Sequence, residues 1–342
     1  MNDARKPART AAAGTVSIAA VAERAGVSIA TVSRVVNGVS KRASADTAAR
    51  VRVAIEELGY RPSGAGQALR RRESRLVAVI AANLANPAMS AIAASAETAL
   101  REAGYVMVLC DSHDKTDLQD EYLREMRAQF VSAFVMLGAV ASPVLDQIVE
   151  AGETVLFVNR RHPDDRPQCF IGIDNAGAGQ EVAAHIGAGN PRDILVIHGP
   201  LTSSATRDRV DAFLTACRNE LPETPVTVAG SNAADHLSIG RNEAEAYLRR
   251  HGRPPSAIFA LSDLIAYGAA RALRDAGHAV PETCRITGFD DNPLNDWIAP
   301  WLSSVRVPYE HFGAAIVASL KVMSVEQAGP RDVLLKHMLV RR

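Results

Sequence analysis

The sequence predicts an α/β protein in which a small N-terminal helical head precedes a larger body with two parallel sheets. From residue 76 onward, short apolar runs alternate with helical stretches, which is typical of parallel strands covered by helices on both faces. These runs are too many for one open sheet, so the body is expected to form two lobes. Residues 17–60 instead show helical periodicity.

The body strands are predicted where apolar residues form continuous runs, because strands buried on both faces do not alternate in polarity. Residues 303–308 are expected to carry the chain back from the second lobe to the first. The predicted strands are Leu76–Ala81, Tyr105–Cys110, Ala133–Leu137, Val155–Asn159, Phe170–Asp174, Ile194–His198, Val226–Ala229, Ala257–Leu261 and Arg285–Phe289.

The composition is that of an ordinary globular protein, with 342 residues, 47% of them hydrophobic and 22% charged. Residues 1–16 carry basic side chains without a continuous apolar core, so they predict a disordered tail rather than a secretory signal. No apolar run reaches the roughly 18 residues of a membrane span. The four cysteines are widely spaced and form no CxxC motif, which fits a reducing compartment. A cytoplasmic protein is therefore expected.

The head shows the pattern of a helix–turn–helix. Ser17 is placed to cap a first helix, Gly26 permits a tight turn, and Ser28 is placed to cap a second helix over 29–37. A third helix is indicated by apolar residues at three- and four-residue spacing: Ala48, Val51, Ile55 and Leu58. Such a unit predicts a DNA-binding domain whose second helix enters a major groove, and the alternative is an ordinary small helical bundle.

The charge distribution favours DNA binding. Residues 1–75 contain fourteen Lys and Arg against six Asp and Glu, a net charge of +8. The whole chain is neutral, so residues 76–342 carry −8. A basic head on an acidic body is the electrostatic layout of a phosphate-binding module. A merely solvated basic face is the weaker alternative, because the same segment carries the helix–turn–helix pattern.

The head also resembles a known family. Residues 17–37, SIAAVAERAGVSIATVSRVVN, closely resemble the N-terminus of LacI/GalR-type bacterial transcriptional regulators, and residues 56–62 resemble the end of that family's head. Later segments fall where family landmarks are expected: 191–194, 206–209, 261–263 and 288–291. The resemblance implies a DNA-binding transcriptional regulator, most simply a repressor. It also implies a bilobal periplasmic-binding-protein-like body that binds a small-molecule effector.

This resemblance implies a division of the chain into a head, a hinge and two lobes. The head is residues 17–60, the hinge is residues 61–75, and the body is residues 76–342. The first lobe is expected to comprise about 76–160 plus 306–325, and the second about 161–305 plus 326–342.

Three residues of the second helix match family positions that face DNA bases: Ile29, Ala30 and Arg34. A guanidinium such as that of Arg34 can donate two hydrogen bonds to guanine O6 and N7. Val32 and Val35 are expected in the core of the head. Short polar side chains are expected to contact phosphates and so position the helix: Ser28, Thr31, Ser33 and Asn37.

In the family, the hinge forms a short helix on DNA and a leucine wedges into the minor groove. Leu69 matches that leucine, and a wedge of this kind bends the duplex. The alternative is that Leu69 docks on the body. Gly64 and Gly66 depart from the family pattern, and each costs about 1 kcal/mol of helix propensity relative to alanine. The hinge is therefore predicted to be disordered away from DNA.

Ligands of parallel sheets bind beyond the carboxyl ends of the strands. This rule and matching family positions predict six effector-binding residues: Asn83, Met89, Asn159, Arg209, Asp263 and Asp290. A guanidinium and a carboxylate facing one cleft can bracket a polyol, a carboxylate or a base edge. The alternatives are an interlobe ion pair for Arg209 and a turn-forming role for Asp290.

Several departures from the family pattern bear on the effector. Asn159 stands where an acid is common, Ser262 stands where an asparagine is common, and no stacking aromatic aligns within 230–240. The basic run 160–162 would favour an anionic effector, and a surface basic patch is its alternative. A sugar or a sugar acid is therefore the expected effector.

No catalytic motif is found. The GxG patterns at 177–179 and 187–189 lack the third glycine of a dinucleotide site, and neither a GxSxG elbow nor a phosphate-binding loop occurs. The acidic run 111–117 is better explained by a polar loop and helix cap than by a metal site. No enzyme activity, cofactor or metal is expected. The alternatives are an architectural DNA-binding protein with a ligand-free body and an α/β metabolic enzyme with an added head.

A homodimer is expected, because one helix–turn–helix contacts only a half-site. Two heads would bind a pseudo-palindromic DNA operator. No heptad helix follows the apolar residues 333–335, so no tetramerising tail is expected.

Overall fold

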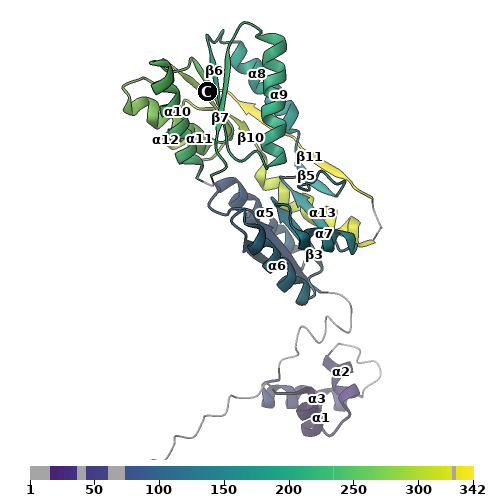
Figure 1. Cartoon of the computed structure of the whole chain (residues 1–342). Helices are drawn as coiled ribbons and strands as arrows, with labels where there is room; N and C mark the ends of the chain where they lie inside the picture. Colours follow the sequence, from purple (N-terminus) through teal and green to yellow (C-terminus); the bar gives the residue numbers. More distant parts are fainter. Residues whose placement is uncertain (1–15, 37–43, 61–73, 234, 326–328) are drawn as a thin grey trace, which may run out of the picture. The chain divides into compact units, whose positions relative to one another are not determined.

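The computed structural model describes residues 16–36, 44–60, 74–233, 235–325 and 329–342 (Figure 1). The chain divides into two compact units, residues 1–74 and residues 75–342. Several predictions fall outside the described residues: the tail up to residue 15, the DNA contact of Asn37, and the hinge over residues 61–73 with Leu69.

The head contains the three predicted helices, α1 (Ile18–Ala25), α2 (Ile29–Val36) and α3 (Ala45–Leu58). Ser17 caps α1 by accepting a hydrogen bond from the Ala20 N–H. The turn after α1 depends on Gly26, which has φ 64°, a conformation that glycine adopts without steric cost. The predicted boundaries of the helix–turn–helix are thereby confirmed.

One apolar face of each helix forms the core of the head. Val32 and Val35 lie in this core, as predicted from helix geometry. Because they fix which side of α2 points inward, they also fix which side is left for a partner. The buried members are Val21, Ala22, Ala25, Val32, Val35, Ala48, Val51 and Ala54.

The body contains two six-stranded sheets, and all nine predicted strands are present with ends shifted by at most one residue. The order in the first sheet is β11-β5-β4-β3-β1-β2, and its strands are parallel. Its strands are β1 (Leu76–Ala81), β2 (Val106–Asp111), β3 (Ala133–Leu137), β4 (Val155–Val158), β5 (Phe170–Ile173) and β11 (Asp332–Leu335).

The order in the second sheet is β12-β10-β9-β8-β6-β7, and only β12 runs antiparallel to its neighbour among the described strands. Its strands are β6 (Ile194–His198), β7 (Val226–Gly230), β8 (Ala257–Ala260), β9 (Arg285–Asp290), β10 (Ser303–Arg306) and β12 (Met338–Val340).

Helices cover both faces of each sheet. In β1, Val77 and Val79 pack toward α5 and α13, whereas Ala78 and Ile80 pack toward α6 and α7, following the two-residue period of a strand. In the second lobe, α8 packs beside α9 and α10 packs beside α11. No helix in the described part of the chain is long and apolar enough to cross a membrane. The helices are α5 (Pro87–Glu102), α6 (Thr116–Ala128), α7 (Pro143–Glu150), α8 (Asn175–Gly187), α9 (Ser204–Glu220), α10 (His236–His251), α11 (Asp263–Asp275), α12 (Asn295–Ile298) and α13 (Phe312–Val325), with a 3-10 turn η2 (Tyr309–His311).

The predicted boundary between the lobes is wrong for two strands. We expected residues 161–173 and 326–335 in the second lobe, but β5 pairs with β4 and β11 pairs with β5 in the first sheet. An irregular segment without a helix connects β4 to β5, and such a break in the strand–helix alternation resembles a change of lobe in the sequence. The chain instead passes between lobes after β5, after β10 and after β11.

Candidate nucleic-acid interface and ligand cleft

The solvent face of α2 carries the predicted DNA-contacting residues that the structure describes. Ser28, Ala30 and Arg34 are exposed, and Ile29 leaves half of its surface in solvent although it is a large apolar residue. Thr31 and Ser33 are partly buried on the same helix. The exposed isoleucine and the exposed arginine of α2 are both available for base contacts, since neither contributes to the core of the head.

Ser28 also caps α2. Its Oγ accepts a hydrogen bond from the Thr31 N–H at 3.2 Å and shares a second one with the Thr31 hydroxyl at 2.9 Å. Its predicted capping role is therefore confirmed. The start of a helix presents unpaired N–H groups and a partial positive charge, which favours a DNA phosphate there.

A candidate ligand cleft lies in the body, where the carboxyl ends of strands from both sheets meet the first turns of α5, α9, α10 and α11. Its cavity measures about 50 Å³. Four of the six predicted effector residues line it: Met89, Asn159, Arg209 and Asp290.

Arg209 forms a fixed cation in the wall of the cleft. Its Nε donates to Asn175 Oδ1 at 2.8 Å, and its guanidinium carbon lies 3.5 Å from the centre of the Phe289 ring. Nη1 also donates to the Leu261 carbonyl at 3.4 Å. Burial lowers the pKa of Arg209, and the nearby Asp290 carboxylate opposes that effect. All these contacts are made within the second lobe, so they do not support the interlobe ion pair considered for Arg209.

Asp290 ends β9 and links the two lobes. The Tyr309 hydroxyl, which follows the return to the first lobe, donates to Asp290 Oδ1 at 2.7 Å. Burial raises the pKa of Asp290 to about 6, and the charge of Arg209 opposes this rise. The backbone of Asp290 has φ 109° and that of Asn159 has φ 67°. Non-glycine residues in this region carry strain of order 1–3 kcal/mol, which is often found at ligand sites.

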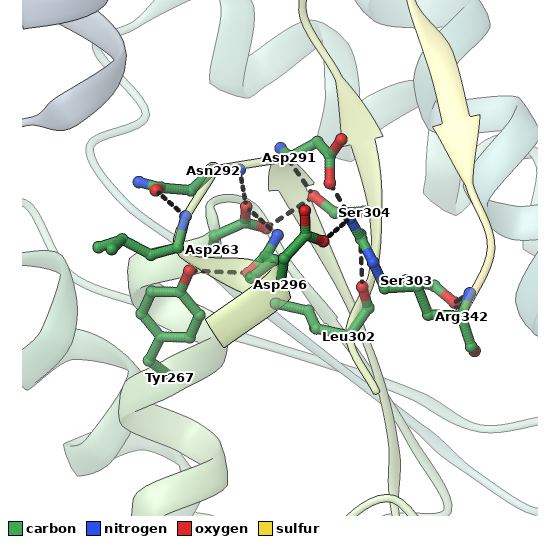
Figure 2. Close-up of polar contacts among 11 residues, drawn as sticks. Asp263, Tyr267, Asp291, Asn292, Asp296, Leu302, Ser303, Ser304 and Arg342 are labelled. Atoms are coloured by element: carbon green, nitrogen blue, oxygen red, sulfur yellow. Dashed lines mark hydrogen bonds and ion pairs between the residues drawn. The ribbon is translucent and has the colours of Figure 1, made fainter. Parts of the chain in front are cut away.

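Two predicted effector residues do not line the cavity. Asp263 is 1% exposed, and its carboxylate accepts hydrogen bonds from the Asn292 N–H at 2.6 Å, the Asn295 side chain at 2.9 Å and the Ser304 hydroxyl at 2.6 Å (Figure 2). These hydrogen bonds hold the loop after β9, and the structure does not place Asp263 in the cavity wall. Asn83 also lies outside the cavity wall, and its Oδ1 accepts a hydrogen bond from the Ala85 N–H in the turn after β1.

Several residues of the cavity wall were not predicted, among them three with a titratable side chain. Tyr309 lies just beyond the predicted crossover at 303–308, and His236 lies within 230–240, where no stacking aromatic aligns. Arg160 was noted as part of a basic run but not placed in the cleft. The available signal was position alone, since each of the three closely follows a strand.

The head and the bilobal body together define a class, the DNA-binding regulators with a periplasmic-binding-protein-type body. Residues 77–295 match the periplasmic binding protein domain family, and residues 17–63 match the family of bacterial regulatory proteins described as lacI. The chain belongs to the periplasmic binding protein domain family through its body, and its head is of the lacI type.

Similar proteins agree with this class over nearly the whole chain. The HTH-type transcriptional regulator PtxS of Pseudomonas putida is 29% identical, and the match covers 89% of this chain and 88% of that protein. The lac repressor dimer bound to operator and the anti-inducer ONPF gives a TM-score of 0.82 at 25% identity, covering 96% and 98%. The transcriptional regulator CelR in complex with cellobiose gives 0.69 at 26% identity, covering 95% and 98%. These relatives are regulators, in agreement with the predicted function and not with its architectural or enzymatic alternatives.

Proposed function

We propose that this chain binds a DNA operator through α2 and releases or strengthens that binding when an effector enters the cleft. The observation that carries the proposal is the exposed face of α2, which combines Arg34, Ile29 and Ala30 in a basic head. Arg34 would read guanine through O6 and N7, and the two apolar side chains would pack on thymine methyl groups. Ser28, Thr31 and Ser33 would hold phosphates and set the register. A regulator with these roles would act in the cytoplasm, where it meets its DNA operator.

Effector control requires the lobes to move. A cavity of about 50 Å³ is much smaller than the roughly 300–1,000 Å³ of ordinary ligand pockets. Entry of a sugar-sized ligand would therefore separate the lobes and break the hydrogen bond between Tyr309 and Asp290. Met89, Asn159, Arg209 and Asp290 would contact the ligand. The ligand shifts the equilibrium only to the extent that it binds one arrangement of the lobes more tightly.

A homodimer would supply the second head for a pseudo-palindromic operator. On and beside α12, three apolar side chains are exposed: Trp297 by 84%, Ile298 by 55% and Leu294 by 51%. Large exposed apolar side chains that cluster mark interaction surfaces more often than they remain solvated. The structural relative with the TM-score of 0.82 is described as a dimer, which supports self-association of this chain.

Selection of operators from random double-stranded DNA by the full chain tests this function. We expect enriched sequences with inverted half-sites, and an affinity for them that falls linearly in a plot of log affinity against log salt concentration. Enrichment of no common sequence, or binding that does not depend on salt, would contradict the proposal.

A further inference from the structure

Two basic side chains line the cavity from opposite lobes. Arg160 follows β4 in the first lobe, and His236 is the first residue of α10 in the second lobe. Both extend across the carboxyl edge of their own sheet, and both pass over a glycine. Each lobe therefore contributes one basic side chain to the wall of the cavity.

Arg160 is fixed along the edge of the first sheet. The Arg160 side chain packs over Gly138, because a Cβ atom added to that glycine would lie 3.3 Å from Arg160 Cδ. Its Nη1 donates a hydrogen bond to Asp114 Oδ1 at 2.7 Å. Gly138 follows β3 and Asp114 follows β2, so the guanidinium is held across neighbouring strands. Its Nε is buried and has no hydrogen-bond partner among the residues that the structure describes. A buried donor of this kind normally has an acceptor, so the surroundings of Arg160 are incomplete as they stand.

His236 is fixed along the edge of the second sheet in a similar way. Its Nδ1 forms a hydrogen bond with the Ser262 hydroxyl, with 2.9 Å between the two atoms. Its Nε2 lies at Gly199, a residue of the cavity wall, where an added Cβ atom would be only 3.1 Å away. The ring is therefore oriented with one nitrogen held by the protein and the other at the cavity.

Basic side chains outnumber acidic ones in the cavity wall. Burial lowers the pKa of His236, and the charges of Arg160 and Arg209 lower it further, while Asp235 and Asp114 act in the opposite direction. Among the described residues of the cavity wall, Asp290 is the one carboxylate. The first turns of α9, α10 and α11 add partial positive charge.

We propose that the cleft binds an anionic polyol whose carboxylate or phosphate group is held between Arg160 and His236. The hydroxyl groups of the ligand would meet Asp290 and Arg209 at the other end of the cavity. This inference rests on the proposed function, because it names the class of effector for the same cleft. One anionic group that contacts both lobes would make their relative position depend on the charge of the ligand.

The neighbouring basic residues do not take part. Arg161 donates to both carboxylate oxygens of Asp332, and its guanidinium lies 4.2 Å from the centre of the Phe170 ring. His162 is 2% exposed and packs against Phe157. Only Arg160 of the basic run 160–162 lines the cavity.

Calorimetry of the full chain with matched six-carbon polyols tests the charge of the ligand. The polyols are used in sets of three: a neutral alditol, the matching aldonate, which carries a carboxylate, and the matching alditol phosphate. The first set is sorbitol, gluconate and sorbitol 6-phosphate, and the same three forms are tested in the galactose and mannose series. We expect at least one anion to bind at least 10-fold more tightly than its neutral partner. Whichever anion binds identifies carboxylate or phosphate as the recognised group. Equal binding of neutral and anionic partners, or no binding by any anion, would overturn the proposal.

Variants then locate the anion subsite. The double variant D114N/R160Q removes the ion pair without leaving a single charge, and H236Q keeps a polar side chain; each should lose the 10-fold preference for the anion. R161Q is the matched control and should keep it. Retention of the preference in both test variants while they remain folded would also overturn the proposal. Operator binding by the same samples without polyol tests the proposed function independently, since its loss would leave the ligand preference measurable.

Discussion

The head and the body hold their candidate functional arginines in opposite environments, exposed in the head and buried in the body. In the head, Arg34 extends from an exposed helix face. In the body, Arg209 is 8% exposed and is held by Asn175, Leu261 and the Phe289 ring. An exposed cation suits phosphate and base contacts that must form and break, whereas a fixed cation suits the recognition of one small molecule. Arg34 is therefore dispensable for the stability of the head, whereas Arg209 contributes to the stability of the body.

The largest expected effect is that of Arg209→Ala. Removing the guanidinium leaves the buried Asn175 Oδ1 without its donor and the buried Asp290 without a nearby positive charge, so we expect a loss of about 3–5 kcal/mol in the stability of the body. Both tryptophans, Trp297 and Trp301, belong to the body, so their fluorescence during denaturation reports its unfolding. The effector response should disappear while DNA binding persists. Arg161→Ala is the control and should cost about 0–1 kcal/mol, because its ion pair is exposed.

A pH titration sharpens the contrast between buried and exposed charges. Burial raises the pKa of Asp263 from 3.8 to about 7, against the effect of its three hydrogen-bond donors. A carboxyl with a raised folded-state pKa stabilises the fold at low pH, and that contribution is lost as pH rises from about 4 to about 7. Over this range the wild type should lose more stability than Asp263→Asn, by about 3 kcal/mol. Parallel curves for the two proteins would contradict this assignment.

The exposed apolar residues at α12 allow a test of whether this surface is used for association or is left in solvent. Replacing Trp297 by serine should weaken the dimer by at least about 2 kcal/mol, since buried tryptophans dominate interface energies. Sedimentation at decreasing protein concentration measures this change. Val325→Ser is a matched control, because Val325 is 86% exposed at the end of α13. An unchanged dimer in Trp297→Ser would place the interface elsewhere.

Arg34→Ala is the counterpart of Arg209→Ala in the head. We expect a loss of about 2 kcal/mol in discrimination at one guanine of the operator, within the range for a bidentate contact, with no loss of stability. Competition binding with operators changed at single positions measures it. Arg24→Ala removes an exposed ion pair to Glu57 and should leave the sequence preference unchanged. If Arg34→Ala keeps the wild-type preference at every position, the base-reading role is refuted.

The smallest expected effect concerns the start of α3. Ser44 accepts a hydrogen bond from the Thr47 N–H at 3.2 Å, so Ser44→Ala should cost the head about 1 kcal/mol. Thermal unfolding of the full chain, followed by the NMR signals of the backbone amides in α1 and α3, measures it. Ser44→Asp keeps a capping oxygen and should restore the stability. An unchanged midpoint in Ser44→Ala would show that this cap contributes nothing.

The difference between head and body also explains what the sequence could predict. The contact face of α2 follows from local periodicity, because burying Val32 and Val35 leaves one side exposed. The cleft depends on where separate strands end in space. Arg209 and Asp290 follow from the position of their strands, but Asp263 adjoins the cavity and turns away because Asn292, Asn295 and Ser304 donate hydrogen bonds to it. The inward direction of Tyr309 and His236 is set by packing between distant segments, which no local pattern encodes.

The central claim is that an effector in the cleft of the body controls DNA binding by the head. Operator affinity of the full chain, measured with and without the anionic polyol that binds most tightly, tests it directly. We predict at least a fivefold change in affinity for the wild type and no change for Arg209→Ala, which should still bind the operator. Equal changes in both proteins, or no change in the wild type, would contradict the account.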